Sequence, residues 1–153
     1  MNPSNTAKLL TAYPLLYREL REWGFECGDG WFDLIWQLSA DIESAARLEG
    51  TAENAETWPS IRILKQKFGL LRVQFGFDVP VSETIHELVT KADKKSQEIC
   101  ECCGSPGKIG GECEDRGWVK ALCESCRKAQ PQPARNQTRP LPVWIQQQNN
   151  NSK

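Results

Sequence analysis

Apolar side chains recur at helical spacing near the start of the chain. Leu16, Leu20 and Trp23 lie three to four residues apart and predict a first helix over residues 14–23. A proline at its start suits the first turn, where a backbone N–H would have no partner within the helix. Residues 1–12 are polar, and we expect them to be frayed.

The same pattern predicts two further helices. The second begins after Asp29, a residue type that commonly caps helices, and ends at Gly50. The third begins after Ser82 and runs to the first of several clustered cysteines. We expect the first two helices to form most of the core, because they supply most of the large apolar side chains. The apolar stripes consist of Trp31, Ile35, Leu38, Ile42 and Ala45 in the second helix and of Ile85, Leu88, Val89, Ala92 and Ile99 in the third.

The segment between these helices alternates in a way that is typical of a β-hairpin, which we place over residues 61–77. A three-residue turn at 68–70 places Ile63 opposite Phe75 and gathers the apolar side chains on one face. A two-residue turn places Ile63 opposite Gln74, which is a less favourable pairing. A short helix over residues 61–68 is the other interpretation.

Length and composition indicate a small protein with one domain and no membrane-spanning helix. The chain has 153 residues, of which 39% are hydrophobic and 25% are charged, and its net charge is -1. This length predicts about one domain and excludes a multi-domain enzyme. No segment approaches the roughly 18 apolar residues of a membrane-spanning helix. The first twenty residues contain no basic segment followed by an apolar run, so we expect a cytoplasmic protein with no membrane contact.

Charge is distributed unevenly. Residues 1–58 carry a net charge of -6, residues 59–99 carry +2, residues 100–128 carry 0 and residues 129–153 carry +3. The last of these segments is rich in proline, glutamine and asparagine, and we expect it to be a disordered tail. It also contains Trp144 within an apolar island, which is either a short partner-binding motif or an incidental patch.

Six of the seven cysteines fall within one short part of the chain. In a reducing compartment such a cluster indicates a metal site before a disulfide. Two C-x2-C pairs separated by nineteen residues have the spacing of a four-cysteine zinc site. The predicted ligands of this site are Cys100, Cys103, Cys123 and Cys126.

Four thiolates fill the coordination shell of zinc and leave no position for an activated water. We therefore expect one structural Zn²⁺ and no catalytic metal. By their spacing, Cys102 and Cys113 are the spare cysteines, although Cys113 could replace a ligand. Cys27 is distant in sequence and is interpreted as a small core residue. Unmetallated buried or surface thiols and a disulfide or redox role are the alternatives.

No catalytic motif is evident. His86 is the only histidine, so no histidine-based metal centre or histidine pair can form. Neither a nucleophile-elbow motif nor a phosphate-binding loop occurs. Asp29 and Asp33 lie one helical turn apart and could bind a metal in a nuclease, but a capping role for Asp29 is the simpler interpretation.

A modest basic strip lies in the predicted hairpin. It contains no acidic residue, and zinc modules often accompany such strips, so nucleic-acid binding is one interpretation and a solvated strand face is the other. The basic side chains are Arg62, Lys65, Lys67 and Arg72.

Several separated motifs, in a constant order, resemble a family of small uncharacterised proteins of bacteriophages and prophages. The motifs are YPLLYREL, GDGWFDLI, KQKFGLLR, CECCGSPG and W-V-x-x-L-C, and they span about residues 13–128. The resemblance implies a phage or prophage origin and a bacterial cytoplasm, and it implies no activity. The cysteine segment also loosely resembles the DksA/TraR-type zinc finger, which would imply contact with RNA polymerase, although the long paired helices of that family are not evident.

The sequence thus predicts an α+β fold. It comprises a helical domain with a β-hairpin over residues 1–99, a zinc module over 100–128 and a disordered tail over 129–153. The predicted function is a non-enzymatic, zinc-binding phage or prophage protein that binds a host protein and modulates host defence or transcription. The alternative is a nucleic-acid-binding protein that uses the basic hairpin and the zinc module.

Overall fold

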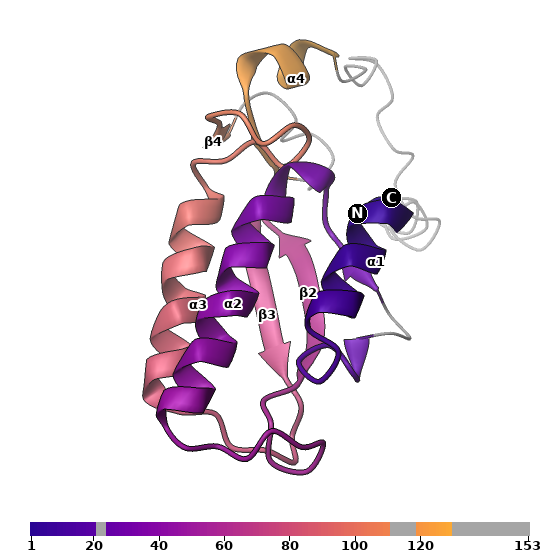
Figure 1. The fold of residues 1–153 in the computed structure, drawn as a ribbon. Coiled ribbons are helices and arrows are strands. Elements are labelled where there is room, and N and C mark those ends of the chain that lie inside the picture. The colour runs from indigo at the N-terminus through magenta and orange to yellow at the C-terminus, as the bar shows by residue number, and fades with distance from the viewer. Residues whose placement is uncertain (21–23, 111–118, 130–153) are drawn as a thin grey trace, which may run out of the picture.

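A computed structural model describes residues 1–20, 24–110 and 119–129 of the chain. Helices cover one face of a three-stranded sheet with the order β1-β2-β3, and the cysteine-bearing segment lies across one end of this layer (Figure 1). The predicted α+β class is confirmed. The main layer consists of α1 (Pro3–Ala12), β1 (Phe25–Glu26), η2 (Asp29–Trp31), α2 (Phe32–Leu48), β2 (Ile61–Lys67), β3 (Leu70–Phe75) and α3 (Glu83–Ser96). The end segment consists of β4 (Lys108–Ile109), β5 (Ala121–Leu122) and α4 (Glu124–Ala129).

Helix α2 is the central element of the core. It ends at Leu48, and Gly50 follows with a φ of 74°. Trp58, from the loop before β2, is also fully buried, which the sequence pattern did not predict. The predicted stripe of Trp31, Ile35, Leu38, Ile42 and Ala45 is buried along its whole length.

The N-terminal helix lies earlier than predicted. Residues 3–12 form α1, because Asn2 accepts a hydrogen bond from the backbone of Asn5 and a proline begins the helix. Residues 14–20 form turns instead of the predicted helix, although Leu16 and Leu20 are fully buried there. The prediction for 14–23 was therefore wrong over its described part, and Trp23 lies outside the described residues.

Asp29 does not cap α2, which corrects a second expectation. It lies in η2, and its Oδ1 accepts hydrogen bonds from the backbone N–H of Asn2 at 2.8 Å and from Nδ2 of Asn5 at 3.1 Å. These bonds lower the pKa of Asp29. The carboxylate thus holds α1 against the loop that precedes α2.

The hairpin forms, but with a different register from the predicted one. Lys67 pairs with Leu70, so the turn has two residues, Phe68 and Gly69, with φ values of 56° and 79°. Two positive φ values are the pattern of a type I′ turn, whose twist matches the strands. Ile63 lies opposite Gln74. The register shifts between Ile61 and Ile63, so that Ile61 and Leu64 are both buried although they are three residues apart. A simple alternation of side chains does not predict this.

Helix α3 packs beside α2 and against β3. Ser82 caps it by accepting a hydrogen bond from the backbone N–H of Ile85, as predicted. Near its other end, Oγ of the buried Ser96 accepts a hydrogen bond from the backbone of Leu71 at 3.0 Å. This bond joins helix and sheet close to the cysteines. None of the helices that the structure describes is both long and apolar enough to span a bilayer.

Candidate metal centre

Four cysteines from two separate segments meet at one end of the molecule. Cys100 and Cys103 follow α3, whereas Cys123 directly precedes α4 and Cys126 lies within it. Their four Sγ atoms lie within 4.8 Å of one another. Sγ of Cys103 and Sγ of Cys123 are 3.7 Å apart. A tetrahedron of sulfur atoms about 2.3 Å from a Zn²⁺ ion has an edge of about 3.8 Å, so the residues fit a four-coordinate, thiolate-bound ion.

Local backbone geometry forms each half of the cluster. The backbone N–H of Gly104 donates to the carbonyl of Cys100 at 2.9 Å, and Gly104 has a φ of 78°, which allows the chain to reverse there. In the second half, the backbone N–H of Cys126 donates to Sγ of Cys123 at 3.4 Å. Both C-x2-C segments are therefore tight turns that present two sulfur atoms to the same point.

Hydrogen bonds stabilise the thiolate form of two of the four cysteines. The hydroxyl and the backbone N–H of Ser105 both bond to Cys103 and lower the pKa of its thiol to about 6. The backbone N–H of Cys126 lowers the pKa of Cys123. Metal ligation requires the thiolate, so these bonds favour the ligating form.

The thiol of Cys126 has the opposite tendency. Hydrogen bonds to the sulfur atoms of Cys103, Cys123 and Cys100 raise the pKa of Cys126 and keep a proton on it. A coordinated thiol loses its proton, because a divalent cation is the largest charge in such a site. A bound cation would therefore displace the proton of Cys126.

A glycine-rich loop clasps the first cysteine turn. The backbone N–H of Gly30 donates to the carbonyl of Glu101 at 2.8 Å, and Nε1 of Trp31 donates to the carbonyl of Ile99 at 3.0 Å. A Cβ on Gly30 would lie 2.1 Å from the carbonyl oxygen of Cys100. A Cβ there would therefore separate the two backbones. The clasp explains why the sequence has glycine at this position, which local patterns did not reveal.

Glu101 is the buried link between the clasp and the second half of the cluster. It is 3% exposed, and its Oε1 accepts a hydrogen bond from the backbone of Gly28 at 3.0 Å. Its Oε2 has no hydrogen-bond partner, but Nζ of Lys120 lies 3.7 Å away. The backbone N–H of Glu101 also donates to the carbonyl of Ala121 at 2.9 Å. Sequence reasoning missed this residue, because a glutamate inside a C-x2-C segment is usually solvated.

The other two described cysteines do not belong to this group of four. Cys27 is buried, as predicted, and burial raises the pKa of its thiol to about 12. Cys102 is exposed, and it is not part of the group of four. Cys113 lies outside the described residues, so its suggested role as a replacement ligand stays a prediction.

The structure distributes the predicted basic strip over both long strands. Arg62, Lys65 and Lys67 lie on β2 and Arg72 lies on β3. Lys65 pairs directly with Arg72, and Nη1 of Arg72 bonds to Oδ2 of Asp93 on α3 at 2.7 Å. Lys65 and Arg72 are therefore neighbours across the hairpin, and Arg72 is joined to a carboxylate on α3.

The remaining candidates are not gathered into a reactive group. The carboxylate of Asp29 is engaged by α1, whereas Asp33 is exposed in the first turn of α2. His86 is exposed on α3, with its ring 6.1 Å from that of Phe75. Trp144 lies outside the described residues.

Comparisons of this chain with family models, with curated proteins and with solved structures found no match. The resemblance to phage proteins therefore rests on the sequence motifs alone.

Proposed function

We propose that this chain is a non-enzymatic protein that holds one structural Zn²⁺ and acts by binding another protein. The observation that carries the first part is the group of four Sγ atoms within 4.8 Å of one another. When bound, Zn²⁺ would join two chain segments and leave no site for a reacting water, because four thiolates complete its shell. Cys100, Cys103, Cys123 and Cys126 would hold it.

Native mass spectrometry of the full chain tests the metal. We expect one zinc ion for each chain, and we expect Cys123→Ser to reduce zinc retention by at least tenfold against a competing chelator. Cys102→Ser is the matched control and should retain the ion. Iron or no metal in the purified protein would overturn the proposal, as would equal retention by both variants.

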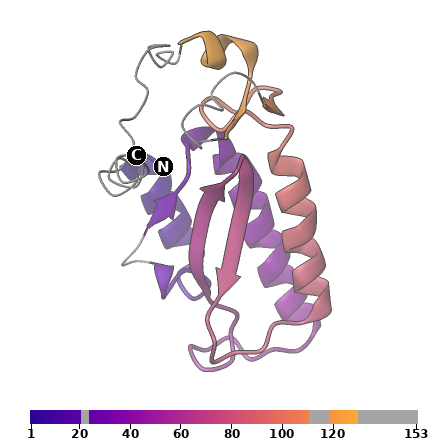
Figure 2. The ribbon, with the colours of Figure 1, turned by 180° about the vertical axis from the view of Figure 1, so that it is seen from behind.

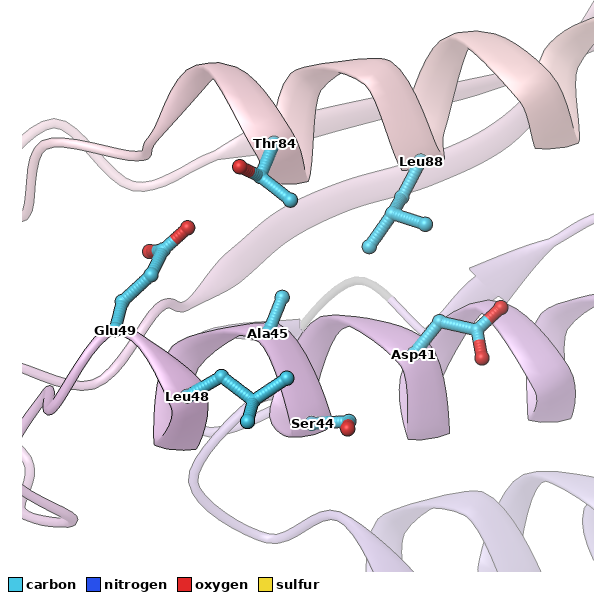
Figure 3. A pocket seen from close by; sticks show the side chains of 7 residues that line it. All are labelled: Asp41, Ser44, Ala45, Leu48, Glu49, Thr84 and Leu88. Carbon is cyan, nitrogen blue, oxygen red and sulfur yellow. The ribbon is translucent and has the colours of Figure 1, made fainter.

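The second part concerns a groove between α2 and α3 (Figure 3). It has a volume of about 480 Å³, and its lining includes the apolar Ala45, Leu48 and Leu88 and the acidic Asp41 and Glu49. Leu48 is 87% exposed and adjoins Ala45 and Leu88 in this lining, so an apolar side chain is accessible to a partner there. A lining that combines apolar and acidic side chains is complementary to a short segment with apolar anchors and basic flanks.

We assign this occupant to a bacterial host protein, with the chain acting in the host cytoplasm, because the sequence motifs resemble those of phage and prophage proteins. Modulation of host defence or transcription is the corresponding biological role. The acidic charge of residues 1–58, net -6, supports a basic partner surface rather than an acidic one.

The groove is tested by capture from bacterial lysate followed by titration of the captured protein after purification. Leu48→Lys should weaken binding by at least tenfold, because it removes the apolar anchor and opposes a basic partner. Thr90→Lys, on the exposed side of α3, should bind as the original chain does. Equal binding by the two variants would exclude the groove, and the absence of any specific protein would overturn the partner proposal while leaving the zinc result intact.

A further inference from the structure

Among the residues that the structure describes, no helix covers the face of the sheet opposite α2 and α3, which is called the uncovered face below. Figure 2 shows β2 and β3 in front, with the helices behind them. Leu64 and Leu71 are each 1% exposed and therefore lie on the helix side. Side chains alternate along a strand, so Lys65 and Lys67 lie on the uncovered side. Arg72 starts from the same side, and its guanidinium reaches Asp93 on α3.

This face retains a charge arrangement that opposes folding. Lys65 and Arg72 are directly opposite each other in the antiparallel pair, and like charges in such positions are destabilising. Glu26 on β1 is next to Lys65 in register, and Asp93 binds Arg72, so part of the repulsion is offset. Lys67 adds a third cation near the turn. A local conflict of this kind is expected where a surface serves a ligand.

Exposed aromatic rings lie at both ends of this basic surface. Phe68 is 59% exposed at the turn, and Phe77 is 87% exposed after β3. Nζ of Lys67 lies 5.5 Å from the ring centroid of Phe68, and the guanidinium carbon of Arg62 lies 5.1 Å from that of Phe77. Each ring is thus paired with a cation.

Phe68 is also the one non-glycine residue with a positive φ in the part of the chain that the structure describes. A bulky side chain is disfavoured there, and asparagine or glycine would suit a type I′ turn better. An exposed ring in a conformation that disfavours it indicates a role other than stability.

From these observations we infer that the uncovered face binds single-stranded nucleic acid. Cations along the strands would contact phosphates, and the rings of Phe68 and Phe77 would stack on unpaired bases. A duplex hides the faces of its bases, so it would gain only the phosphate contacts. β2 has seven residues and is about 20 Å long, enough for a short site of about four nucleotides. This inference uses a surface distinct from the α2–α3 groove and does not depend on the protein partner.

Fluorescence anisotropy of the full, zinc-loaded chain tests it, with labelled dT12, rU12 and a 12-base-pair duplex as probes. We expect at least one single strand to bind tenfold more tightly than the duplex at low salt. Phe68→Asn should weaken single-strand binding about tenfold, because it removes a stacking ring while suiting the turn. Phe77→Ala should act in the same direction.

Lys65→Gln and Lys67→Gln should each weaken binding and reduce the salt dependence by roughly 0.7 in the log–log slope. Lys91→Gln, on the exposed surface of α3, is the matched control and should leave both quantities unchanged. Binding that is equal for duplex and single strand and is insensitive to Phe68→Asn would overturn the stacking role. The absence of binding to all three probes at low salt would overturn the inference. A preference for dT12 or rU12 would identify DNA or RNA as the natural class.

Discussion

Gly30 illustrates how one missing side chain allows two distant segments to touch. It precedes α2, yet its backbone lies against the turn formed by Cys100 to Gly104. A Cβ on Gly30 would lie 2.1 Å from the carbonyl oxygen of Cys100 and 2.4 Å from the backbone nitrogen of Gly104. Backbone atoms cannot give way as a flexible side chain can, so the two segments would have to separate.

Gly30→Ala should therefore lower the free energy of unfolding by about 3 kcal/mol, the upper part of the usual range for overpacking. Urea unfolding of the zinc-loaded chain measures this change. Gly50→Ala is the control, since Gly50 has a φ of 74° and a Cβ there would meet no atom within 4 Å. It should cost only about 1 kcal/mol, from backbone strain alone. A smaller effect for Gly30→Ala than for Gly50→Ala would contradict the clasp.

Glu101 is the second residue whose role depends on distant contacts. Replacement by alanine leaves the N–H of Gly28 without its acceptor and removes the carboxylate that lies near Lys120. We expect Glu101→Ala to destabilise the chain by about 2 kcal/mol, the usual cost of an unpaired buried donor. Glu101→Gln keeps an acceptor of the same size and should cost less than half as much. Thermal unfolding of both variants checks the difference, and equal losses would show that charge matters more than the hydrogen bond.

At the scale of elements, the cysteine-bearing end has little apolar packing of its own. None of the side chains of α4 is buried, and β4 and β5 each have only two residues, of which Ala121 and Leu122 in β5 are buried. In contrast, α2 and α3 pack on each other and on the sheet. The end segment should therefore depend on the metal, whereas the main layer should not.

Removal of zinc by a chelator should expose the backbone amides of β4, β5 and α4 to rapid hydrogen exchange. Amides within α2 should keep their protection, because this helix packs on α3 and does not depend on the four clustered cysteines. Hydrogen exchange followed by mass spectrometry distinguishes the two regions. Uniform loss of protection over the whole chain would contradict the division of stability that we derive from burial.

The hairpin turn is an element whose sequence opposes its conformation. Phe68→Asn should stabilise the chain by about 0.5–1 kcal/mol, because asparagine accepts the positive φ of 56° more readily. Denaturant unfolding measures this gain. If the variant were less stable, the ring of Phe68 would contribute packing that outweighs the backbone strain. Together with weaker nucleic-acid binding, a stability gain would separate function from folding at this position.

At the scale of the whole molecule, the sequence predicted what local signals determine. Three predicted features depend on residues that are close in sequence, and all three are found in the structure. They are the apolar stripe from Trp31 to Ala45, the cap at Ser82 and the two C-x2-C pairs. The hairpin was also predicted, but its register depends on how Ile61 and Leu64 fit the core. The alternation of side chains alone does not predict the irregularity that places both Ile61 and Leu64 in the core.

Contacts between distant segments left no local signal. The helix at residues 3–12 is held by Asp29, which lies more than twenty residues away. The contact between Gly30 and Glu101 joins two motifs that were interpreted separately, one as a helix start and the other as a metal turn. The positions of these motifs could be predicted, but their mutual contact could not.

Burial of Cys27 should make the stability of the whole molecule decrease at alkaline pH. Burial raises the pKa of this thiol from an ordinary value of 9.0 to about 12 in the folded chain. The resulting stabilisation is complete below pH 9 and is lost as the pH rises from 9 towards 12, at up to about 1.4 kcal/mol for each pH unit. Cys27→Ala should lose less stability than the original chain over this interval, as measured by urea unfolding at several pH values. Parallel losses would show that other groups dominate.

The hydrogen bond from the indole of Trp31 to the carbonyl of Ile99 ends one residue before the first sulfur donor. Trp31 is fully buried at the start of α2, so its surroundings change if the adjacent turn loosens. The chain has six tryptophans, so the part of the emission that Trp31→Phe removes would report metal loading in solution without any attached dye.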